Sequence, residues 1–151
     1  MVCLVNRAQR VKMIGDIGEN LIKEILEAEG NHVELSENKF DNVKDMICGK
    51  QSVEVKTLVC IRKFNAFCLG SSQWKKCDEV DRLFFVMIPD VDFSSVFVYE
   101  AMKPRKHETM FYNNDQCRMY GLTDLNIYGI IENENIAKQL RDLSPSKYLK
   151  R

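Results

Sequence analysis

The stretch 43–57, VKDMICGKQSVEVKT, constrains the fold of this chain more than any other part of the sequence. Two runs rich in β-forming residues flank Gly49-Lys50. A two-residue link with glycine first is typical of a type II′ hairpin turn. This turn pairs Cys48 with Gln51, and that register decides which face of the sheet each residue of the hairpin occupies.

The same register brings acidic side chains together. Asp45 is predicted to lie directly opposite Glu54, and Cβ atoms of opposed residues are about 4.5–5.5 Å apart. Lys56 follows two residues after Glu54 and therefore lies on the same face. Because like charges directly opposite each other are destabilising, two facing carboxylates favour a cation between them. The register therefore predicts a metal site, and the alternative is a solvated cross-strand charge cluster.

The other face of the hairpin is apolar and is expected to pack against the core. Its side chains are those of Met46, Cys48, Val53 and Val55.

Length and charge indicate one globular domain over residues 1–151. Hydrophobic residues make up 45% and charged residues 29% of the chain, which is ordinary for a globular protein. The 22 acidic and 22 basic side chains give a formal net charge of zero. A neutral balance gives no global attraction to a polyanion, so a nucleic-acid surface would depend on local clustering of charge.

Cysteine spacing and hydropathy predict a cytoplasmic protein that does not enter a membrane. The six cysteines form no C-x-x-C motif and no zinc-type pattern with the two histidines. Reduced, mostly buried thiols are therefore expected. No apolar run reaches the ~18–20 residues that span a bilayer, and the first residues lack the core of a signal peptide.

Periodicity predicts the remaining elements up to residue 100. Apolar residues at helical spacing indicate a helix over about 11–29, ended by Gly30-Asn31. A second helix is expected over about 73–80, with a preceding serine as its N-cap. Strands are expected at 32–35, 64–69 with a bend at Arg62-Lys63, 82–88 and 94–100, and the apolar run at 82–88 indicates burial on both faces.

The last third is less regular. Residues 103–107, KPRKH, read as a basic loop that is either solvated or in contact with phosphates. Residues 111–115 and 123–126 are expected to be irregular, 127–131 to form a short strand, and 135–143 to form a closing helix.

The predicted order is helix, strand, strand carrying Asp45, strand carrying E-x-K, helix and buried strand. With this order, the sequence resembles the PD-(D/E)XK nuclease superfamily, whose fold is called restriction-endonuclease-like. The resemblance covers about residues 11–100 and leaves 101–151 as peripheral C-terminal elements. It implies an α/β fold with a central mixed β-sheet flanked by helices.

The resemblance also implies roles for the hairpin residues. Asp45 matches the motif aspartate, Glu54 the following acid and Lys56 the motif lysine. Asp45, Glu54 and the carbonyl of Val55 would then hold Mg²⁺ or Mn²⁺, and these hard ions prefer such oxygen ligands. Lys56 would orient the attacking water or stabilise the charge that develops on the phosphorus-bound oxygens.

The resemblance implies site roles for two further residues. Glu19 matches the helical glutamate that many members use as an additional metal ligand or water-binding group. Gln73 looks like a glutamine found near the site in several branches. For Glu19 the alternative is a solvated helix residue, and for Gln73 it is a position at a helix start without a role in the site.

The sequence thus predicts a metal-dependent endonuclease that hydrolyses DNA, with a homodimer as the expected form for cutting two strands. A ribonuclease of the same fold is the alternative within enzymes. The other alternative is a nucleic-acid-binding or assembly subunit whose catalytic site has lapsed.

Overall fold

The structure of the protein, a computed structural model, describes residues 7–36, 45–60, 66–89, 95–132, 134–136 and 138. Its elements in chain order are α1 (Arg7–Ala28), β1 (Val33–Leu35), β2 (Met46–Cys48), β3 (Gln51–Cys60), β4 (Ala66–Leu69), α2 (Ser71–Cys77), β5 (Arg82–Pro89), β6 (Ser95–Glu100), β7 (Glu108–Tyr112), β8 (Asp115–Gly121), the 3₁₀ turn η1 (Leu122–Asp124) and β9 (Asn126–Glu132).

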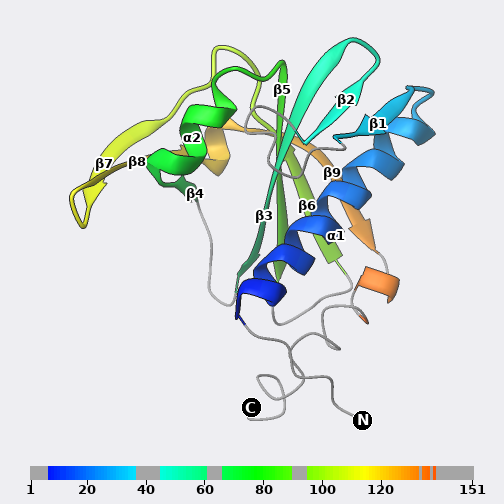
Figure 1. The fold of residues 1–151 in the computed structure, drawn as a ribbon, viewed down its shortest axis with the longest axis horizontal. Coiled ribbons are helices and arrows are strands. Elements are labelled where there is room, and N and C mark those ends of the chain that lie inside the picture. The colour runs from blue at the N-terminus through cyan, green and yellow to red at the C-terminus, as the bar shows by residue number, and fades with distance from the viewer. Residues whose placement is uncertain are drawn as a thin grey trace.

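The fold is mixed α/β and is built on two sheets. A six-stranded mixed sheet has the order β1-β2-β3-β5-β6-β9, in which β3 and β5 are parallel and the other pairs antiparallel. A three-stranded antiparallel sheet has the order β4-β8-β7. Figure 1 shows α1 running along the large sheet, with α2 and the small sheet grouped together at one side. The central mixed sheet with helices agrees with the fold class expected from the sequence.

The predicted hairpin register is confirmed. Cys48 pairs with Gln51 and Met46 with Val53, as the two-residue turn requires. Gly49 has a φ of 61°, which suits the first turn position of a type II′ turn and explains why a glycine stands there.

Each face of the large sheet has its own core. One cluster joins α1 to the apolar face of the β2–β3 hairpin, and it includes the four side chains predicted to lie there: Met46, Cys48, Val53 and Val55. The other joins α2 and the small sheet to the opposite face of β5, through Leu83 and Phe85. The alternation along β5, with Phe84 and Val86 in the first cluster, confirms that this strand is buried on both faces.

The N-terminus of α2 differs from the prediction. The helix begins at Ser71, its N-cap position is Gly70, and no side chain of the N-cap residue caps it. Instead the carboxylate of Asp115, at the start of β8, accepts hydrogen bonds from the Ser71 amide (3.1 Å) and hydroxyl. These bonds lower the pKa of Asp115. The predicted serine N-cap is therefore wrong, because a carboxylate distant in sequence takes that role.

The predicted irregular segment 111–115 is also wrong. It contains the end of β7, the turn Asn113-Asn114 and the start of β8. Asn113 and Asn114 have φ values of 49° and 63°, and two positive φ angles in sequence match a type I′ hairpin turn. Asparagine tolerates this conformation, so the Asn-Asn pair was the available signal.

In the predicted basic loop, Arg105 is neither solvated nor free for phosphate. Its guanidinium donates hydrogen bonds to the carbonyls of Cys77 (2.6 Å), Val80 (2.9 Å) and Ala101 (3.2 Å). Arg105 thus satisfies carbonyls at the C-terminal end of α2, where a positive charge also complements the helix dipole.

The predicted strand at 127–131 is confirmed as β9, which pairs with β6 as an outer strand of the large sheet. The predicted bend at Arg62-Lys63 and most of the closing helix over 135–143 lie outside the described residues.

The middle of α1 approaches β3 closely at Gly18. A Cβ atom at this position would overlap the hydroxyl of Thr57 and lie 2.9 Å from its Cβ atom. The hydroxyl is buried and has no hydrogen-bond partner among the described residues. The absence of a side chain at Gly18 therefore sets the distance between the helix and the strand that carries Glu54 and Lys56.

We expect Gly18→Ala to lower the free energy of unfolding by about 1–3 kcal/mol, because overpacking forces the helix away from β3. Gly15→Ala is the matched control, since a Cβ at Gly15 meets nothing within 4 Å. In the control, the better helix propensity of alanine should raise stability by up to about 1 kcal/mol. Urea denaturation of both variants tests this, and equal stability of the two would contradict the contact.

Candidate functional site

The candidate site lies beside β3, at the N-terminal end of β2. β2 pairs with β3 only as far as Val53, whereas β5 follows β3 on its other side from Val53 to Cys60. From Glu54 onward, no strand among the described residues covers that side of β3. Glu54 and Lys56 therefore lie beside an open edge of the sheet rather than inside a continuous one.

Asp45 connects the groups around this edge. Its amide donates to the carbonyl of Val53 (2.9 Å), the residue that already pairs with Met46, so the strand departs from the regular register at Asp45. Its carboxylate accepts a hydrogen bond from the Val55 amide at 2.7 Å. The same carboxyl group is close enough to hydrogen-bond with both Glu19 of α1 and Glu54 of β3. The structure thus brings together three of the predicted acidic residues.

Lys56 joins the cluster on the same side of β3. Its Nζ atom lies 3.5 Å from an Oε atom of Glu54, and both side chains are largely buried. Cys77, the last residue of α2, is fully buried, and its thiol is near enough to this pair to be influenced by the charges of Lys56 and Glu54. Burial raises the pKa of the Cys77 thiol to about 11. Sequence reasoning missed this neighbour, since its position depends on how α2 packs on the sheet.

The carboxyl groups resist ionisation in this arrangement. Burial raises the pKa of Glu19 to about 8, and the charge of Asp45 and a hydrogen bond with it add to the effect. Burial also raises the pKa of Glu54, which is only 4% exposed, to about 8. The hydrogen bond and charge of Asp45 act in the same direction, and the opposing effect of Lys56 does not cancel them. Without a cation, Glu19 and Glu54 are therefore mostly protonated at neutral pH.

The carboxylate oxygens of Asp45 and Glu54 are ligands of the type that a hard divalent cation prefers. Among the described residues, no three Asp, Glu, His or Cys side chains are arranged to hold a metal ion on their own. Mg²⁺ does not require such a cage, since it commonly binds through one or two carboxylates and completes its shell with water and substrate phosphate. Asp45 and Glu54 could supply these carboxylates, and a cation there would take the place of the proton that Glu54 retains.

Gln73 is not brought into this cluster. It is exposed in the first turn of α2, and no described hydrogen bond or ion pair links its side chain to Asp45, Glu54 or Lys56. The metal-binding roles of Asp45, Glu54, Glu19 and the Val55 carbonyl remain predictions.

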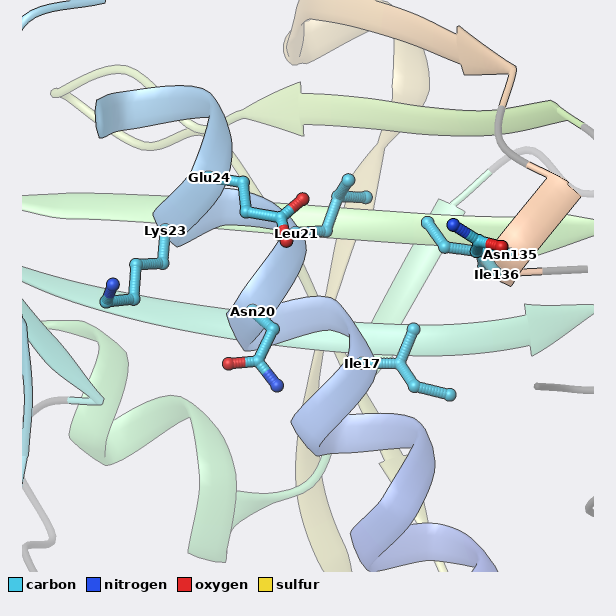
Figure 2. Close-up of a pocket in the computed structure, with 7 residues that line it drawn as sticks. All are labelled: Ile17, Asn20, Leu21, Lys23, Glu24, Asn135 and Ile136. Atoms are coloured by element: carbon cyan, nitrogen blue, oxygen red, sulfur yellow. The ribbon is translucent and has the colours of Figure 1, made fainter. Parts of the chain in front are cut away.

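A separate pocket of about 330 Å³ lies on another part of α1. Figure 2 shows it between the helix and residues 134–136. Its lining residues come from these two segments and include none of the carboxylate cluster: Ile17, Asn20, Leu21, Lys23, Glu24, Asn135 and Ile136.

Comparisons of the chain with protein families, with curated proteins and with solved structures found no match. None of the described helices is long and apolar enough to span a membrane.

The raised pKa values predict how stability depends on pH without a metal. Glu54 has a pKa of about 8 when folded and an ordinary value of 4.5, so between these pH values the folded protein keeps a proton that the unfolded chain releases. In EDTA, stability should therefore fall as pH rises from about 4.5 to about 8. Glu54→Gln should reduce this slope by up to about 1.4 kcal/mol per pH unit.

Urea denaturation at several pH values measures the slope. Glu24→Gln is the control, because Glu24 is exposed on α1, outside the cluster. A slope that Glu24→Gln and Glu54→Gln change equally would show that Glu54 is not held protonated by its surroundings.

Proposed function

We propose that the protein is a metal-dependent endonuclease that hydrolyses phosphodiester bonds of DNA with Mg²⁺ or Mn²⁺. One observation carries the proposal: the carboxyl group of Asp45 meets those of Glu19 and Glu54, while the Lys56 amine lies 3.5 Å from Glu54. A random surface cluster of charges would be solvated, whereas here Glu54 and Lys56 are largely buried at the edge of a sheet.

Each residue of the site has its own role in the hydrolysis of the phosphodiester bond. When bound, a divalent cation polarises the phosphoryl oxygen and lowers the pKa of a bound water. Asp45 and Glu54 hold the cation, and the Val55 amide fixes the Asp45 carboxylate in place. Lys56 orients the attacking water or stabilises the charge that develops on the phosphoryl oxygens. Glu19, reaching the site from α1, binds a second ion or an outer water.

The order of elements supports the restriction-endonuclease-like form of the fold. From α1 through β1, β2 and β3 to α2 and β5, it follows the order expected from the sequence, with β4 inserted before α2. A ribonuclease is the second candidate, because the same groups can cleave the phosphodiester bond of either polymer. The lapsed binding subunit is disfavoured because Asp45, Glu54 and Lys56 are all present and in contact.

Cleavage and binding should respond differently to substitution. Asp45→Asn and Glu54→Gln remove a metal ligand and should abolish cleavage, while the loss of a negative charge leaves DNA affinity equal or higher. Lys56→Ala should also abolish cleavage but slightly lower affinity, because it removes a cation. Asparagine is preferred to alanine at Asp45, since it keeps an acceptor for the Val55 amide.

Plasmid nicking, cleavage of branched DNA and RNA, and fluorescence anisotropy, each with Mg²⁺, Mn²⁺ or EDTA, give the readouts. Glu24→Gln and Lys50→Ala, both at exposed positions, control for the change of charge alone. A wild type that binds DNA or RNA but cuts neither would support the lapsed subunit instead.

A further inference from the structure

The tip of the β7–β8 hairpin exposes a large aromatic side chain. Phe111 is 73% exposed, and every residue of β7 is exposed. Figure 1 shows the hairpin projecting beyond α2, away from α1. A phenylalanine gains most by burial, so its exposure at the end of an ordered hairpin indicates a contact with a partner.

Phe111 lies on the face of the hairpin that packs against α2. It pairs with Gln116, and directly paired residues share a face, which along β8 also carries Arg118. The Arg118 guanidinium lies 3.8 Å from the centre of the Trp74 ring and donates to Asp78 at 2.6 Å. Phe111, Trp74 and Arg118 therefore belong to one surface.

The hairpin is fixed to α2, and α2 leads to the carboxylates. Trp74 donates from its ring nitrogen to the carbonyl of Gln116 at 2.8 Å, which holds β8 to the helix. At the C-terminal end of the helix, three residues after Trp74, Cys77 is fully buried near Lys56 and Glu54. The seven residues of α2 span about 10 Å. One short helix therefore separates the β7–β8 hairpin from the carboxylate cluster.

The surface along this path carries an exposed amine beside its aromatic rings. Lys75 is exposed on α2, and its amine lies 5.7 Å from the centre of the Trp74 ring. A partner that fits must offer flat rings to Phe111 and negative charge to Lys75. Single-stranded nucleic acid has both, whereas a duplex hides the faces of its bases in the stack.

We propose that the β7–β8 hairpin binds an unpaired stretch of the nucleic-acid substrate, with a base stacked on Phe111 and a phosphate at Lys75. This inference rests on the proposed function, because it assigns the strand beyond the scissile phosphate to this surface. The preferred substrate would therefore contain a single-stranded region next to the bond that is cut.

The test uses the full chain with Glu54→Gln, which should bind without cutting. A single-stranded oligonucleotide containing 2-aminopurine reports stacking by loss of its fluorescence, and anisotropy reports affinity. Phe111→Ala should weaken single-strand binding about tenfold and restore fluorescence, whereas Phe111→Trp should preserve both. Affinity for a duplex should change little.

Two substitutions serve as matched controls. Tyr112 is 66% exposed but pairs with Asp115, so it lies on the opposite face of the hairpin, and Ile127 is 69% exposed on β9. Tyr112→Ala and Ile127→Ala should leave single-strand affinity unchanged. A Phe111→Leu variant that binds as well as the parent would overturn the stacking of a base on Phe111. An equal loss of affinity for single strand and duplex in Phe111→Ala would overturn it as well.

The outcomes separate this inference from the proposed function. If wild type cleaves nucleic acid and Phe111→Ala binds like its parent, the hairpin inference fails alone. If wild type cleaves nothing yet Phe111→Ala weakens single-strand binding, the nuclease proposal fails and the hairpin inference stands. A Glu54→Gln parent that binds no single-stranded oligonucleotide would overturn the hairpin inference. A mass of the protein in solution that falls with Phe111→Ala would also overturn it, because Phe111 would then contact another copy of the chain.

Discussion

The pairing of β2 with β3 is the constraint on which the rest of the molecule depends. Side chains alternate along a strand, so a slip of one residue would exchange the apolar and charged faces of the whole hairpin. The turn at Gly49 prevents this slip, and α1 and α2 then pack on faces that the turn has already assigned. Asp45 lies one residue beyond the paired part of β2 and reaches Glu54 from there, with its amide bonded to the carbonyl of Val53.

Burial and charge oppose each other at the open edge of β3. An ionised carboxylate loses hydration when α1, α2 and the sheet surround it, and a second carboxylate nearby makes the loss greater. Folding therefore brings Glu19 and Glu54 into a state in which a proton or a cation has to neutralise them. A region selected only for stability would replace such groups with apolar side chains, and this is the physical reason to look for chemistry here.

Local pattern predicted much of the fold and the centre of the site. The helix α1, the hairpin, the doubly buried β5 and the strand β9 follow from periodicity and turn residues. The register also led us to expect Asp45 near Glu54, although the pairing of β2 with β3 stops at Met46. Contacts between distant segments were not predictable in this way. Asp115 at the start of α2, Arg105 at its end and Cys77 beside Lys56 all depend on how α2 packs, which no local pattern contains.

The capping of α2 by Asp115 also bears on the order in which the protein folds. A helix of seven residues is too short to be stable alone, because its nucleation is unfavourable and few hydrogen bonds follow. Ser71 and Asp115 are 44 positions apart, so closing this contact requires a long loop to lose its freedom first. During synthesis, α2 would therefore remain unformed until β8 has left the ribosome. The face of the large sheet that α2 covers would stay exposed while the hairpin with Asp45 and Glu54 is already complete.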